Sequence, residues 1–264
     1  AKGWQGDLGP YFAHREYLHV NSNILYDVDS PDGYVSLAPN YIVDVWGDMN
    51  RRGFVFNTFS IGKADFSAAP AFIKLLNMFN VKYLILAKPY RGSSMKLVER
   101  GKNFLLYENP TVLPRAYVVG GYRLASNPDE ARRILLSGEY NPSMEAILYE
   151  RPYQEISPGQ AESIVKIEKY AGNSVRLQAS MAGPGLLVLA DTFYPGWEAE
   201  VDGAKTPILK ANLCQRAIFV PAGNHTVRFR FRPNSLAIGL AVTVLGIAAL
   251  GAMFILAGRK GRTA

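Results

Sequence analysis

The sequence predicts an α+β protein: a small α/β region, then an antiparallel β-sandwich or jelly roll, then one C-terminal transmembrane helix. Three observations predict this class. Residues 71–86 combine apolar residues at helical spacing with a strand-like apolar run. Residues 146–232 hold eight short strand-like segments separated by turn residues at regular intervals. Residues 235–258 contain no charged side chain.

The first region, residues 1–142, is expected to be irregular and aromatic-rich up to about residue 60, and α/β after that. Ser67 is suited to cap a helix that runs to Asn80, and Asn127 to cap a second helix that Pro128 opens. Strands are expected at residues 81–86, 104–107 and 116–124.

The second region, residues 143–234, is expected to form the sandwich. The Asp202-Gly203 pair between two short segments is a strong hairpin signal. The last segment alternates apolar and basic residues, which predicts one buried and one exposed face. The expected strands are Ala146–Tyr149, Ser163–Tyr170, Ser174–Ser180, Leu186–Asp191, Glu198–Val201, Thr206–Leu209, Arg216–Val220 and His225–Arg232.

Residues 235–258 are expected to cross a membrane, because a helix of this length would measure about 36 Å against a hydrocarbon core of about 30 Å. A basic tail, residues 259–264, follows directly. Three basic residues flank the helix on each side, so the positive-inside rule gives a tie. A short tail counts for more than a folded domain, which favours a cytoplasmic C-terminus and an extracytoplasmic bulk.

Composition excludes several classes of protein. The chain has 264 residues, 48% hydrophobic and 19% charged, which excludes global disorder. The single cysteine, Cys214, excludes a disulfide framework and a multi-cysteine metal site. The net charge of +7 includes three positive charges of the C-terminal tail and no long block of like charges, so we expect no nucleic-acid partner. The opening, without Met, suits a processed chain or a piece of a longer one.

Several motifs together resemble the C-terminal part of the bacterial YfhO membrane-protein family. They stand in the same order along nearly the whole chain. They are the turn at residues 33–34 (GY), residues 80–85 (NVKYLI), 107–110 (YENP), 113–116 (LPRA), 193–203 (FYPGWEAEVDG), 220–227 (VPAGNHTV) and 232–233 (RP).

This resemblance implies a protein with many transmembrane helices, similar to membrane-embedded glycosyltransferases that use polyprenyl-phosphate-linked sugars. The catalytic acids of such enzymes lie in an early extracytoplasmic loop, so the resemblance assigns no catalytic residue to this chain. It implies a bacterial cell-membrane location. The partners it implies are the lipid bilayer, other transmembrane helices of a parent protein, and a cell-envelope glycan or polyprenyl-linked sugar.

Two groups of side chains are candidate binding residues. Tyr194 and Trp197, with Glu198 and Asp202, could form a glycan surface in which rings stack on sugars and carboxylates accept hydroxyl hydrogen bonds. The alternative places Trp197 in the core and Asp202 in the hairpin turn. The second group, Arg228, Arg230 and Arg232, could contact lipid phosphates or a pyrophosphate-linked donor; the alternative is a solvated strand face.

Catalytic and cofactor sites are not predicted. His14 and His19 lack the spacing of metal ligands. The acidic residues between Asp191 and Asp202 show no perturbed pair of the kind a glycosidase requires. No phosphate-binding glycine loop is present. We therefore expect no metal, no cofactor and no sugar transfer by this chain alone.

The sequence thus leaves two functions open. The first is the extracytoplasmic portion of an envelope glycosyltransferase-like protein, which positions an acceptor glycan or polymer. The alternative is a non-enzymatic, membrane-anchored module that binds a glycan or a protein.

Overall fold

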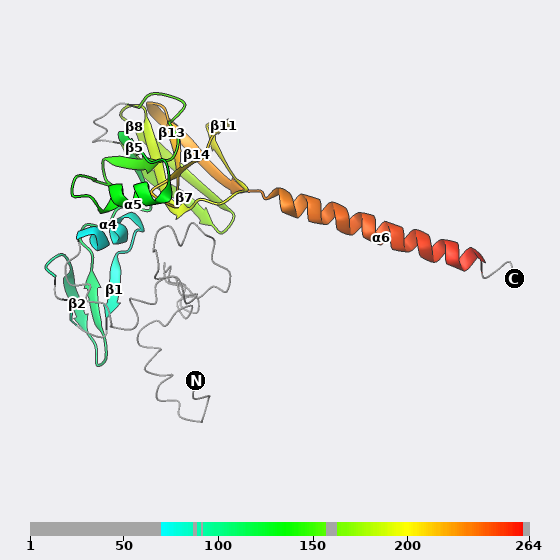
Figure 1. Cartoon of the computed structure of the whole chain (residues 1–264), viewed down its shortest axis with the longest axis horizontal. Helices are drawn as coiled ribbons and strands as arrows, with labels where there is room; N and C mark the ends of the chain where they lie inside the picture. The colour runs from blue at the N-terminus through cyan, green and yellow to red at the C-terminus, as the bar shows by residue number, and fades with distance from the viewer. Residues whose placement is uncertain (1–69, 87–88, 91, 157–162, 261–264) are drawn as a thin grey trace.

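A computed structural model describes residues 70–86, 89–90, 92–156 and 163–260, and two face-to-face β-sheets form its main body (Figure 1). The irregular, aromatic-rich stretch expected up to about residue 60, with its turn at residues 33–34, and the predicted helix cap Ser67 lie outside the described residues. A core of buried side chains from both sheets fills the space between them. The predicted α+β class with a sandwich is confirmed.

The first sheet has five strands in the order β11-β10-β14-β8-β7, with every pair antiparallel. In β8 every second side chain is buried, as expected where one sheet face meets the core and the other meets water. The strands are β7 (Ile164–Ala171), β8 (Ser174–Met181), β10 (Trp197–Val201), β11 (Ala204–Thr206) and β14 (Gly223–Phe231).

The second sheet has six strands in the order β4-β9-β13-β12-β6-β5. All six side chains of β13 are buried, because apolar clusters cover both faces of this sheet. The strands are β4 (Ala116–Val119), β5 (Gly121–Leu124), β6 (Glu145–Leu148), β9 (Gly185–Thr192), β12 (Leu209–Ala211) and β13 (Gln215–Val220).

Three details of the sandwich differ from the sequence prediction. The strand expected at 116–124 divides into β4 and β5, which lie at opposite edges of the six-stranded sheet. The strand expected at Thr206–Leu209 divides at Pro207 into β11 and β12, because the chain crosses there from one sheet to the other. β5 and β6 pair in parallel, joined by helix α5 (Pro128–Leu136), so the sandwich is not purely antiparallel.

The domain boundary expected at residue 143 stays a prediction. The six-stranded sheet contains strands from both sides of this position.

A smaller unit lies beside the sandwich. Helix α4 (Pro70–Met78) packs on a three-stranded sheet of order β1-β3-β2. Strands β1 (Tyr83–Leu86) and β3 (Leu105–Glu108) were expected. Strand β2 (Lys96–Arg100) was not, because all five of its side chains are exposed and its sequence shows no apolar alternation.

Helix α6 (Asn234–Lys260) leaves the sandwich and projects away from it (Figure 1). Among the described residues it is the one helix long and apolar enough to cross a membrane, with a mean hydropathy of 1.9 over Asn234–Gly251. None of this span is buried, and Leu236 is 72% exposed. A helix of a soluble core would be covered by other elements, so its bare apolar surface supports the predicted membrane span.

A buried amide joins the smaller unit to the sandwich. Asn212, which is 1% exposed, accepts hydrogen bonds from the Ile147 amide (2.9 Å) and the Tyr140 hydroxyl (3.0 Å). Its Nδ2 donates to Gln215 Oε1 (2.9 Å), and Gln215 Nε2 in turn donates to the Met78 carbonyl at the end of α4. Burial raises the pKa of the Tyr140 phenol, which keeps it a neutral donor.

We predict that Asn212→Ala lowers the free energy of unfolding by about 3 kcal/mol, because several buried polar groups lose their partners together. Asn127→Ala is the control: it removes one exposed cap bond, to the Glu130 amide, and is expected to cost about 1 kcal/mol. Denaturant unfolding in detergent, followed by tryptophan fluorescence, measures both. Equal losses would contradict the role assigned to Asn212.

Candidate functional site

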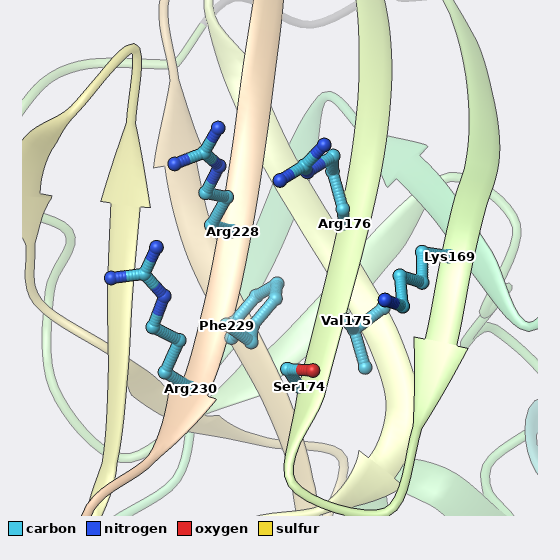
Figure 2. A pocket seen from close by; sticks show the side chains of 7 residues that line it. All are labelled: Lys169, Ser174, Val175, Arg176, Arg228, Phe229 and Arg230. Atoms are coloured by element: carbon cyan, nitrogen blue, oxygen red, sulfur yellow. The ribbon is translucent and has the colours of Figure 1, made fainter.

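The outer face of the five-stranded sheet carries a basic hollow of about 200 Å³, here called the basic pocket. Figure 2 shows its lining side chains, which come from the neighbouring strands β7, β8 and β14. The lining residues are Lys169, Ser174, Val175, Arg176, Arg228, Phe229 and Arg230.

Strand register explains why cations gather in the basic pocket. Arg228 lies directly opposite Arg176, and Arg176 lies opposite Lys169 on its other side. Arg230 lies opposite Ser174. Inward-facing neighbours fix this orientation, because Phe229 and Val175 are 0% and 2% exposed in the sandwich core. Alternation along each strand then turns the basic side chains outward.

Two acidic residues of this face, Glu198 and Glu200, lie on β10 and are near other cations. The Glu198 carboxylate is 3.5 Å from Lys205 Nζ and 3.9 Å from Arg232 Nη1. The Glu200 carboxylate is 3.9 Å from Arg230 Nη1. The acids therefore lie along the edge of the basic pocket rather than within it.

The three arginines predicted as a phosphate contact divide into two places. Arg228 and Arg230 line the basic pocket. Arg232 lies beyond the end of β14, toward α6, with 61% of its side chain exposed. The sequence prediction missed Lys169, Ser174 and Arg176; the alternation within β8 was readable, but its pairing with β14 was not.

The four residues predicted as a glycan surface do not come together. Tyr194 is 47% exposed in the turn before β10, and its ring centroid lies 6.2 Å from that of Phe231. Trp197 packs toward the core, while the next residue, Glu198, faces outward. Asp202 lies at the far end of β10, five residues and about 17 Å from Trp197. A glycan contact by any of them separately stays a prediction.

A buried ion cluster lies behind Trp197 and was not predicted. The Arg216 guanidinium, 2% exposed, donates from Nη2 to Asp191 Oδ2 at 2.8 Å and stacks 3.9 Å from the Trp197 ring. Arg115 Nε donates to Asp191 Oδ1 at 3.0 Å, and the Tyr170 hydroxyl donates to Oδ2 at 3.0 Å. Burial, together with the Asp191 charge, raises the pKa of Tyr170 to about 12. The signal available in the sequence was one arginine directly before the apolar run of residues 217–220.

This ion cluster accounts for Asp191, which the sequence offered as part of an acidic group. Its carboxylate is committed to two arginines and a tyrosine, and so is not open to a substrate. Among the described residues no three of His, Cys, Asp and Glu lie close enough to hold a metal ion. His14 and His19 lie outside the described residues.

We predict that Asp191→Asn lowers the free energy of unfolding by about 3–5 kcal/mol, because Arg216 is left buried without a carboxylate. Asp129→Asn removes an ion pair whose aspartate side chain is 84% exposed. This control should change stability by less than about 0.5 kcal/mol. Denaturant unfolding measures both, and a loss in Asp191→Asn no greater than in the control would show that the cluster is not a structural requirement.

Asp202 is held in the hairpin turn by the neighbouring strand. Its carboxylate accepts hydrogen bonds from the Thr226 amide (2.8 Å) and pairs with His225 Nδ1 (2.7 Å). The His225 and Thr226 hydrogen bonds lower the pKa of Asp202. Burial disfavours the charged His225 ring, but the hydrogen bonds to Asp202 and to the Ala222 carbonyl raise its pKa above the ordinary value.

The signs of these two shifts define a pH window for the pair. Stability from His225 is present below pH about 6.5 and is lost as the pH rises through its raised pKa. Stability from Asp202 is present above pH about 4 and is lost as the pH falls through its lowered pKa. We predict that between pH 6 and pH 9 the wild-type Tm falls relative to that of His225→Gln, as measured by circular dichroism. Parallel Tm profiles would contradict the pairing.

Comparison with known proteins finds a family that is similar to part of the chain. No curated protein and no solved structure matches the chain. Residues 141–243 match the family described as bacterial membrane protein YfhO. The match spans β6 to β14 and the first part of α6, so it contains the basic pocket and every residue of the ion cluster except Arg115. The resemblance drawn from the sequence is confirmed over residues 141–243, the part of the chain that is similar to the bacterial membrane protein YfhO family.

Proposed function

We propose that this chain is the extracytoplasmic C-terminal portion of a multi-spanning bacterial envelope protein. The whole protein resembles glycosyltransferases that use polyprenyl-phosphate-linked sugars. In it, the sandwich positions an acceptor glycan or polymer at the membrane surface and carries none of the catalytic residues.

The junction between the sandwich and α6 is the observation that carries this proposal. Only Arg232 and Pro233 separate β14 from α6. The Arg232 amide donates to the Gly196 carbonyl at 2.6 Å, which ties this short link to the turn before β10. A rigid junction of this kind holds a domain at a set height above the bilayer, whereas a long flexible linker would not.

Gly196 is required for this close approach. Its φ of +102° lies in a region that side chains rarely adopt, and an added Cβ would come within 3.0 Å of Pro233 Cα and 3.1 Å of the Phe231 ring. The turn can therefore pack directly against Pro233, the residue before α6.

Aromatic side chains at this end of the sandwich support a position at the membrane surface. Trp197 and Phe231 pack with ring centroids 5.4 Å apart, and Tyr194 is half exposed beside them. Tyrosine and tryptophan are enriched where membrane meets water. The basic tail after α6 favours a cytoplasmic C-terminus, which would put the sandwich on the opposite side.

A linker insertion tests the positioning role. We predict that eight Gly/Ser residues inserted between Pro233 and Asn234 of the full-length parent protein reduce sugar transfer at least fivefold, because a loose tether lowers the effective concentration of the acceptor. The assay supplies membranes with a polyprenyl-phosphate-linked hexose and measures its incorporation into envelope polymer. The insertion lies outside the sandwich, so the fold and the surface of the sandwich are expected to stay unchanged.

The control is the same insertion between Gly138 and Glu139, an exposed turn where an added Cβ would meet nothing within 4 Å of Gly138. It should leave transfer unchanged. An impermeant maleimide applied to intact cells checks sidedness through Ser126→Cys, since Ser126 is exposed and Cys214 is buried. Unchanged transfer with the Pro233 insertion would refute positioning and favour a non-enzymatic binding module.

A further inference from the structure

We propose that the basic pocket is a binding site for a phosphate ester. Lys169, Arg176, Arg228 and Arg230 supply the positive charge, and Ser174 supplies a neutral hydroxyl donor. This inference goes beyond the proposed function, because it holds whether or not the parent protein transfers a sugar.

The arrangement of charge across the sheet favours a bound anion. One row of cross-strand neighbours on four adjacent strands reads Glu200, Arg228, Arg176 and Lys169. Three cations in succession are destabilising, since like charges directly opposite each other repel. The single acid of the row lies at one end, and its carboxylate is 3.9 Å from Arg230 instead.

Ion pairs among the described residues do not neutralise this row. Within the described part of the chain, no carboxylate forms an ion pair with Lys169, Arg176 or Arg228. The Nε atom of Arg228 is buried and makes no hydrogen bond to the described residues. A buried donor without a partner is costly, so a bound acceptor would relieve both the repulsion and this unmet hydrogen bond.

The donor set suits phosphate better than carboxylate. Three guanidinium groups present planar forks that match phosphate oxygens, and the ammonium and hydroxyl groups add separate single donors. A carboxylate offers two oxygens, whereas a phosphate ester offers three or more to donors that converge from three strands. In Figure 2, Arg228 and Arg176 extend side by side from the neighbouring strands β14 and β8, and the Lys169 side chain is directed toward β8. The hollow of about 200 Å³ is large enough for one such group.

Its height above the membrane favours a ligand from the aqueous side. The sandwich lies beyond the N-terminal end of α6 (Figure 1). Arg228 is six residues before Asn234, which is up to about 20 Å along an extended chain. The headgroup layer of one leaflet is only about 5–8 Å thick. Arg232 is within reach of lipid phosphates, but the basic pocket is better placed for a soluble or polymer-borne phosphate ester.

Glycerol 3-phosphate and the full chain in dodecyl maltoside micelles test the site. We expect the ³¹P resonance of glycerol 3-phosphate to broaden on binding, and Arg176→Gln to weaken binding about 10- to 100-fold through loss of charge-assisted hydrogen bonds. Ser174→Ala changes no charge and should weaken binding several-fold. Lys205→Gln is the matched control, because it removes a cation from the same sheet outside the pocket; it should change affinity less than twofold.

A second arm identifies the source of the phosphate. The Tm of the chain is compared in nanodiscs of phosphatidylcholine with and without phosphatidylglycerol. Stabilisation by phosphatidylglycerol that is lost in Arg176→Gln would assign the site to a lipid phosphate, and broadening of glycerol 3-phosphate would assign it to a soluble ester. The proposal is overturned if neither probe binds, or if Lys205→Gln weakens binding as much as Arg176→Gln.

Discussion

The buried pair of Arg216 and Asp191 holds the two sheets together at the end of the sandwich where α6 begins. Both residues belong to the six-stranded sheet, whereas Trp197 and Tyr170, which complete the cluster, belong to the five-stranded sheet. Arg216 Nε and Nη1 make no hydrogen bonds to the described residues, and the guanidinium instead lies 3.9 Å from the indole ring. Interaction with the ring face compensates part of the burial of that charge. Because Trp197 is fixed in this way, the turn before it is fixed as well.

Strand β14 links the core of the sandwich to the basic pocket and to α6. Its inward residues Val227 and Phe229 are fully buried, so its outward residues Arg228 and Arg230 are fixed on the opposite face. The same strand continues through Arg232 and Pro233 into α6. Core packing, the basic pocket and the membrane anchor therefore share one rigid element. A ligand bound in the basic pocket would be held at a constant distance from the bilayer.

On β8, β10 and β14, acids and bases of the outer face are separated rather than interleaved. The carboxylates of β10 lie near Lys205, Arg230 and Arg232, while β8 contributes Arg176 and the Ser174 hydroxyl, and β14 contributes Arg228 and Arg230. A solvated surface strand selected only for solubility would mix the two signs. The separation leaves positive charge concentrated on one side of the face. This concentration of charge is what suits the face to binding an anion.

The sequence by itself determined the elements that depend on local pattern. The uncharged run at 235–258, the Asp202-Gly203 hairpin and the alternation of the last strand were all predicted, because each depends on neighbours a few residues apart. Tertiary structure decided what depends on pairing between distant segments. Arg228 meets Arg176 across 52 residues of sequence, and Arg216 meets Asp191 across 25. Strand register is set by how the buried faces of all the strands fit together, so neither the basic pocket nor the ion cluster was visible until the sheets were assembled.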